Sequence, residues 1–199
     1  TGQLWEDGPI WADRNVGANE PWEYGYYFWW GDTVGYTNTN PSGGGQWVSV
    51  DGKGTQITFG DVSPANTTYG KSIDDLKALD NGESYIDVNS NLVAKFDAAA
   101  AHWKGSWRMP TPCDFDELLD WCVWEVAELN GTYGFKATSR VNGNWIFFPS
   151  SLDGTLYWTN RLSGVENACA LKMSTQYWPE YRNDRRTEGW QIRPVCPVG

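Results

Sequence analysis

The sequence predicts an α+β protein that combines two helices with a run of mixed or antiparallel strands. Three observations support this prediction. Short apolar stretches are separated by Gly, Pro and Asn turn signals, as is typical of strands. Two segments in the middle of the chain carry helix start signals. From residue 130 onward the pattern indicates strands alone, so helices and strands occupy separate parts of the chain.

The N-terminal segment, residues 4–35, is dense in aromatic residues. Gly and Pro divide it into short extended pieces. We expect strands at residues 11–12 and 26–30.

Residues 36–92 are expected to form one long inserted loop and hairpin region. Apolar and polar residues alternate in residues 47–50 and 56–59, as they do in the two strands of a hairpin, around Asp51-Gly52. The region is too poor in apolar residues to bury a core of its own. The chain, residues 1–199, is therefore expected to be a single domain.

Two helices are predicted after this insertion. The first spans residues 97–103 and ends at Gly105. The second begins with Thr111 as N-cap, Pro112 at the first helical position and Asp114 as the capping-box acid. Its apolar face is expected to hold Phe115, Leu118, Leu119 and Cys122. Its carboxylates are interpreted as a solvated face rather than a catalytic pair; they are Asp114, Asp116, Glu117 and Asp120.

The C-terminal part of the chain is predicted to consist of strands. Residues 135–141 and 145–148 flank Asn142-Gly143, a strong hairpin signal. Further strands are expected at residues 156–159, 168–173 and 190–195. The stretch between the last two is polar and contains several aromatic residues.

Composition excludes several classes of function. The 199 residues include 14 Trp, 10 Tyr and 7 Phe, but one His, and the formal net charge is −10. An acidic chain is unsuited to nucleic acid, which needs a basic face. One His, His102, and no CxxC argue against a metal site, and we expect no cofactor. No apolar run reaches the ~20 residues that span a bilayer, so no membrane insertion is expected.

No signal peptide is expected within this sequence, because residues 1–5 lack a charged and an apolar region. Its cysteines are Cys113, Cys122, Cys169 and Cys196. The first two lie nine residues apart in the sequence, which in a helix would separate them by roughly 13 Å. A disulfide needs Cα atoms within about 7 Å, so these two should not pair with each other. Free thiols are favoured for the set.

Several strings occur in one order along nearly the whole chain. They are residues 11–18 (WADRNVGA), 23–33 (EYGYYFWWGDT), 97–99 (DAA), 107–111 (WRMPT), 142–149 (NGNWIFFP), 157–159 (YWT) and 189–195 (GWQIRPV). In this order they resemble the Fibrobacter succinogenes major paralogous domain of gut bacteria and their phages. The resemblance covers about residues 5–197. It implies a C-type-lectin-like fold and kinship with the variable proteins of diversity-generating retroelements.

The resemblance also implies a ligand-binding C-terminal region, residues 156–197, in which fixed scaffold positions alternate with variable ones. The fixed positions map to Tyr157, Trp158, Ala168, Leu171, Arg185, Gly189, Arg193, Pro194 and Val195. The solvent-facing, ligand-binding positions map to Arg161, Ser163, Glu166, Asn167, Cys169, Lys172, Ser174, Gln176, Tyr177, Trp178, Glu180, Tyr181, Asn183, Asp184, Thr187, Glu188 and Trp190. Rigid aromatic residues among adaptable polar ones are typical of a binding surface.

The hypothesis is a non-enzymatic module that displays a binding face to a protein or glycan, at a cell surface, outside the cell or on a phage virion. Mutated Asn codons cannot yield Trp, Lys, Gln or Glu, which stand at several variable positions. Both a diversified protein and a fixed paralogue therefore stay open. One alternative is a carbohydrate-binding or adhesive domain. Another is an enzyme of the formylglycine-generating type, which would use Cys169 or Cys196. Calcium is not expected, because no run supplies six to eight oxygen ligands.

Overall fold

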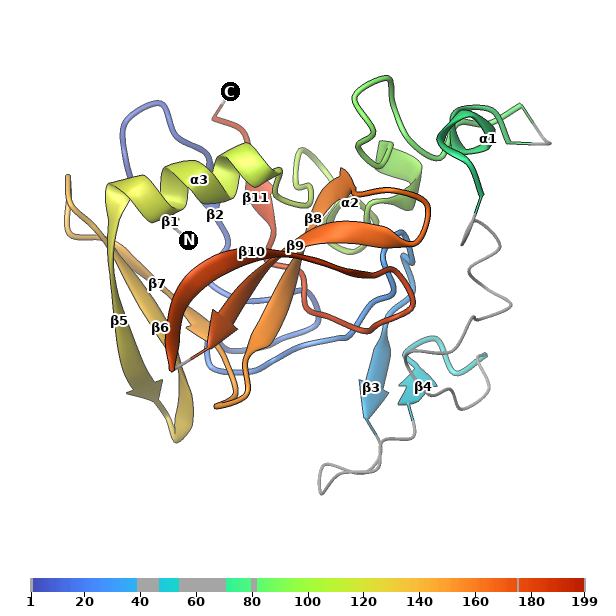
Figure 1. The fold of residues 1–199 in the computed structure, drawn as a ribbon. Helices are drawn as coiled ribbons and strands as arrows, with labels where there is room; N and C mark the ends of the chain where they lie inside the picture. Colours follow the sequence, from blue (N-terminus) through green and yellow to red (C-terminus); the bar gives the residue numbers. More distant parts are fainter. Residues whose placement is uncertain (1, 39–46, 54–70, 80–81, 175, 199) are drawn as a thin grey trace.

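The computed structural model describes residues 2–38, 47–53, 71–79, 82–174 and 176–198 (Figure 1). Within these residues the chain forms three helices and four small antiparallel sheets, which confirms the α+β class. The helices are α1 (Ile73–Lys77), α2 (Ala98–Trp103) and α3 (Pro112–Trp121), with a 3₁₀ turn at Ala94–Phe96. The strands are β1 (Gly2–Gln3), β2 (Ile10–Trp11), β3 (Tyr36–Asn38), β4 (Trp47–Ser49), β5 (Cys122–Leu129), β6 (Thr132–Ser139), β7 (Trp145–Pro149), β8 (Thr155–Leu162), β9 (Asn167–Ser174), β10 (Tyr177–Arg185) and β11 (Val195–Cys196).

Helix α3 begins with the predicted capping box. The Thr111 hydroxyl accepts a hydrogen bond from the Asp114 N–H at 3.1 Å, and the Asp114 carboxylate accepts one from the Thr111 N–H at 2.6 Å. The prediction that Asp114 belongs to the solvated face is wrong, since the residue is only 8% exposed. Its carboxylate receives two hydrogen bonds from the Arg108 guanidinium, at 2.7 and 3.1 Å. This ion pair ties the helix start to the preceding segment.

Strand β5 follows α3 directly and was not predicted. It pairs along its whole length with β6, from Cys122↔Ser139 to Leu129↔Thr132. Burial alternates at its start, where Cys122 and Trp124 are buried and Val123 and Glu125 are exposed. The sequence signal for β5 was the change in the spacing of apolar residues from that of a helix to a period of two. The predicted hairpin around Asn142-Gly143 is confirmed as β6 and β7.

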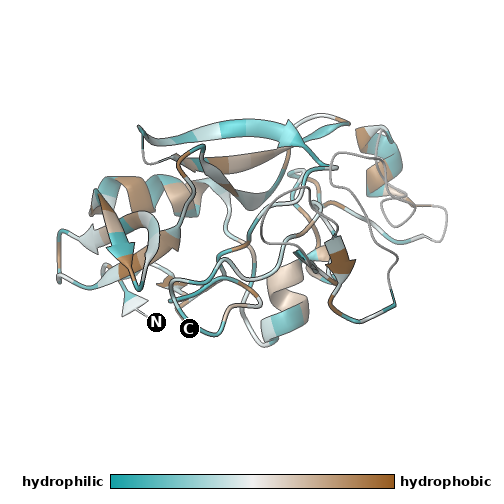
Figure 2. Ribbon diagram, turned by 90° about the horizontal axis from the view of Figure 1, so that it is seen from below, coloured by the Kyte–Doolittle hydropathy of each residue, from teal (hydrophilic) through white to brown (hydrophobic). Residues whose placement is uncertain are grey.

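The other large sheet has the order β10-β9-β8. Its third strand, β10, lies in the polar stretch to which the sequence assigned no strand. Figure 2 shows β10 as a mainly hydrophilic strand along one margin of the fold. Most side chains of β10 are exposed, so its polar residues stay in water.

Two predicted strands are shorter than expected. Residues 26–30 form only isolated bridges, Tyr27↔Tyr36 and Phe28↔Trp190. The strand predicted at 190–195 reduces to β11 at its end, Val195–Cys196. The main chain of these segments bonds to several different partners in turn, so no continuous ladder forms.

In the predicted insertion, β4 pairs with β3. The predicted partner of β4, residues 56–59, lies outside the described residues. Helix α1 was not predicted. The later part of the insertion contributes Leu76, Tyr85 and Ile86 to a core shared with Phe28.

Side chains of β8 and β9 alternate between two hydrophobic cores, so this sheet separates them. Trp158 and Ala170 point into the first core, which α2 covers. Tyr157 and Leu171 point into the second core, which α3 covers. The second core also encloses Arg193, whose guanidinium is fully buried.

Arg193 is predicted to be essential for stability. Its guanidinium donates hydrogen bonds to Asn15 Oδ1 at 2.8 Å, Phe147 O at 2.8 Å and Ala12 O at 3.3 Å. Arg193→Ala leaves these buried acceptors without donors and should lower the free energy of unfolding by at least about 3 kcal/mol. Urea denaturation measures this. The exposed Arg182→Ala control should change it by no more than about 0.5 kcal/mol.

A second prediction concerns pH and Asp114. Burial alone would raise the pKa of this carboxyl, but the Arg108 and Thr111 hydrogen bonds outweigh it and lower the pKa below its ordinary value. A depressed folded pKa stabilises the protein above the unfolded value of about 3.9, and this contribution is lost as pH falls through the folded pKa. Asp114→Asn should therefore cost about 2 kcal/mol at neutral pH and progressively less below pH ~4. A constant difference across that range would contradict the assignment.

Candidate functional site

Strands β9 and β10 bring many of the predicted site residues onto one sheet, but on its two opposite faces. Residues directly opposite on antiparallel strands share a face. Glu180 stands opposite Lys172 and Asp184 opposite Ala168, on the face of the first core. Asn183 stands opposite Cys169, on the face that α3 covers. A hollow with polar walls lies along the first of these faces, and Asn183 also contributes to its wall although it belongs to the other face.

This polar hollow has a volume of about 410 Å³. Its walls come from β9, β10, the start of β8 with the loop before it, and the segment after β10. The lining residues are Asp153, Gly154, Leu156, Lys172, Arg182, Asn183, Asp184 and Trp190. Four of them, Lys172, Asn183, Asp184 and Trp190, were predicted as ligand-binding positions.

Hydrogen bonds fix several walls of the polar hollow. The Trp190 indole N–H donates to Asp184 Oδ2 at 2.6 Å, and the Trp190 ring packs partly against the first core. Arg182 donates to Glu180 Oε1 at 2.7 Å. No ion pair is recorded for Lys172 in the described part of the chain, so its ammonium is available to a ligand. The hollow thus offers a held indole, a carboxylate and a cation.

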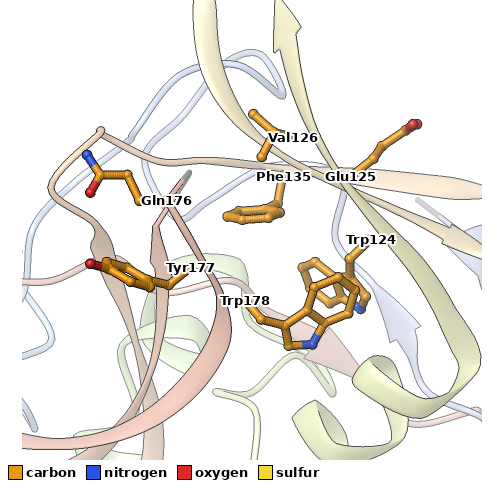
Figure 3. Close-up of a pocket in the computed structure, with 7 residues that line it drawn as sticks. All are labelled: Trp124, Glu125, Val126, Phe135, Gln176, Tyr177 and Trp178. Carbon is orange, nitrogen blue, oxygen red and sulfur yellow. The ribbon is translucent and has the colours of Figure 1, made fainter.

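A second, apolar groove of about 190 Å³ lies between the β9–β10 turn and the β5–β6 hairpin (Figure 3). Its rim carries two of the most exposed aromatic side chains, Tyr177 at 67% and Trp178 at 60%. The β5–β6 hairpin supplies Trp124, Val126 and Phe135. Gln176 and Glu125 complete the lining. The residues from β5 and β6 were missed because β5 itself was not predicted.

The remaining predicted positions lie elsewhere. Ser174 and Thr187 are buried, at 3% and 1% exposure, and so do not face solvent as the resemblance implies. Arg161 hydrogen-bonds to Asn91, distant from the groove at the other end of β8. Near that same end lie Ser163, Glu166 and Asn167. Glu188 accepts a hydrogen bond from Arg185 at 2.6 Å.

Tyr181 and Cys169 face helix α3. The Tyr181 hydroxyl donates to Pro112 O, and burial together with Asp116 raises the pKa of this phenol. Burial likewise raises the pKa of the Cys169 thiol, which keeps the sulfur protonated at neutral pH. All four cysteines are free, as predicted. His102 lies in α2, with its Nε2 3.1 Å from Val34 O, rather than beside a cysteine.

Among the described residues, no three His, Cys, Asp or Glu side chains gather closely enough to hold a metal ion. None of the helices within the described ranges combines the length and the apolar character that a transmembrane span needs. Comparison of the chain with protein-family models, with curated proteins and with solved structures finds no match in any of the three.

Gly154 is predicted to control the position of Lys172. Its φ is +100°, and a Cβ there would stand 2.6 Å from Lys172 Cε. Gly154→Ala should therefore lower the free energy of unfolding by about 1 kcal/mol because of the backbone conformation, and by a further amount because Lys172 is displaced.

The matched control is Gly164→Ala, with φ +85° and open space around the added Cβ. It should show only the backbone cost in urea denaturation. A double-mutant cycle with Lys172→Ala should remove the excess cost at Gly154. Equal costs at the two glycines would show that Gly154 does not hold Lys172.

Proposed function

We propose that this chain is a non-enzymatic ligand-binding module with a C-type-lectin-like fold, and that the polar hollow beside β10 is its main recognition site. The observation that carries this proposal is the convergence of Lys172, Arg182, Asp184 and Trp190 on one open hollow. These residues come from two strands and a following segment, so the fold assembles them.

The side chains of the polar hollow form a binding surface that is already ordered before a ligand binds. A sheet strand between two packed cores holds Lys172, and Trp190 is held by Asp184 and by the first core. A site whose side chains are already ordered loses less conformational entropy on binding. Aromatic residues with adaptable polar neighbours are the composition of binding surfaces in general.

We further propose that the module acts at a cell surface, outside the cell or on a phage virion, as a diversified protein or as its fixed paralogue. The resemblance in residue order supports this. Several positions that it implies to be variable do line the polar hollow and the apolar groove. The ligand in this proposal is a protein or a glycan on another surface.

A carbohydrate ligand has a specific observation in its favour. The polar hollow combines a partly exposed indole with a carboxylate, an amide and an ammonium group. A sugar ring presents C–H groups that stack on an aromatic face and hydroxyls that both donate and accept hydrogen bonds. A formylglycine-generating activity is less well supported, because a reactive thiol requires a lowered pKa and that of Cys169 is raised.

Binding screens test this function. The chain is applied to a glycan array and to a panel of bacterial surface proteins, and any ligand found is titrated against variants. Asp184→Ala removes the carboxylate and releases the Trp190 indole, so affinity should fall by about tenfold or more.

Glu117→Gln, on the exposed face of α3, is the control and should bind as the unmodified chain does. Circular dichroism of each variant checks that the fold is retained. A ligand whose affinity is the same for Asp184→Ala and for the control would place the recognition site elsewhere on the molecule.

A further inference from the structure

Strand β5 is an eight-residue edge strand. It runs over Cys122–Leu129 at one end of the β5-β6-β7 order, with no strand on its other side in the described ranges. Figure 1 shows it at the margin of the molecule, with β6 and β7 on one side only. An exposed edge presents unpaired N–H and C=O groups to which another strand can bind.

The hydrogen-bond register identifies which groups these are. The Arg140 N–H donates to Trp121 O at 2.9 Å, one step before the pair Cys122↔Ser139. In an antiparallel pair, bonded and non-bonded positions alternate. Val123, Glu125 and Ala127 therefore bond to β6, and the main-chain groups of Trp124, Val126 and Glu128 point away from it. No backbone hydrogen bond to these three from another described element is recorded.

Hollows lie on both sides of this free edge. The apolar groove, with Trp124, Val126 and Trp178, lies on the face that continues the second core. Another hollow, of about 330 Å³, lies on the opposite face of this sheet. Lys136, Trp145 and Phe147 form part of its walls. Side chains of an added strand alternate between the two faces of a sheet. Successive residues of such a strand would therefore enter the two hollows in turn.

Charge indicates the kind of strand that fits. Glu125 and Glu128 are exposed on β5, and Glu125 lies 3.5 Å from Lys136. Glu128 stands opposite Tyr133 and lies on the other face of β5, the face that carries Val126. A second copy of β5 would bring two more glutamates to this edge, in a chain of net charge −10. Opposite charges across a strand pair are stabilising and like charges are not, so a basic partner strand fits this edge better than a second copy of β5 does.

We propose that the free edge of β5 binds an extended segment of a partner protein as an added strand, with apolar side chains in the apolar groove and basic side chains toward Glu125. In this mode main-chain hydrogen bonds supply affinity and the alternating hollows supply specificity. The site is separate from the polar hollow, so it stands independently of the function proposed above.

The probe is a nine-residue peptide of alternating Val and Lys, acetylated and amidated at its ends, titrated calorimetrically against the full chain. Binding should slow hydrogen exchange at the amides of Trp124, Val126 and Glu128. A peptide N-methylated at alternate residues cannot donate to the edge and should bind at least about tenfold more weakly. A Val–Glu peptide should not bind.

Variants of Val126 locate the contact. Val126→Pro removes one outward N–H, a change that edge strands tolerate, and should weaken peptide binding by about tenfold. Val126→Ala keeps the N–H and should have a smaller effect. Asp184→Ala, in the polar hollow, should leave peptide binding unchanged.

Three outcomes would overturn the proposal. The first is an absence of binding by the Val–Lys peptide. The second is binding that is equal for the N-methylated peptide. The third is a concentration-dependent dimer of the chain that Val126→Pro abolishes, which would identify a second copy as the occupant of the edge.

Discussion

The buried guanidinium of Arg193 is the interaction on which the rest of the fold depends. It reaches Asn15 and Ala12 in the N-terminal segment and Phe147 in β7, and it lies over the Phe148 ring with 4.4 Å between the guanidinium carbon and the ring centre. Burial lowers its pKa to about 10, so it remains charged at neutral pH. A buried cation needs acceptors, and those available here are carbonyl and amide oxygens of segments far apart in sequence. One side chain therefore fixes the relative positions of the two ends of the chain and the hairpin between them.

Aromatic donors extend this constraint to the sheet that carries the site. The Trp158 indole N–H donates to Phe28 O, and the Trp30 indole N–H donates to Thr159 O, both at 2.8 Å. The Tyr157 hydroxyl donates to Pro149 O at 2.7 Å. The first two of these bonds join the N-terminal segment, which has little regular ladder, to β8, which explains how an aromatic, loop-rich region forms an ordered scaffold. β8 is held on both faces, and β9 and β10 are aligned on it.

Local signals were sufficient for some elements. Thr111, Pro112 and Asp114 specify the start of α3, and Asn142-Gly143 specifies the β6–β7 hairpin, because capping and tight turns involve only neighbouring residues. β10 was missed because its residues are polar, and only pairing with β9 makes them a strand. β5 was missed because it follows a helix without a turn signal. The candidate site shows the same division: its residue types were predicted within β9, β10 and the segment that follows, whereas Asp153, Trp124 and Phe135 entered through contacts distant in sequence.

The sequence by itself determined the α+β class, the capping box of α3, the C-terminal hairpin and the concentration of aromatic and charged side chains in residues 172–190. Each of these follows from spacing and turn chemistry within a few residues. Only the tertiary structure decided which of those side chains share a surface. Strand pairing sends alternate residues to opposite faces, so Lys172 and Asp184 open into a hollow, whereas Cys169 and Tyr181 face a helix. That choice depends on register between strands, and register is set by the packing of both cores rather than by local sequence.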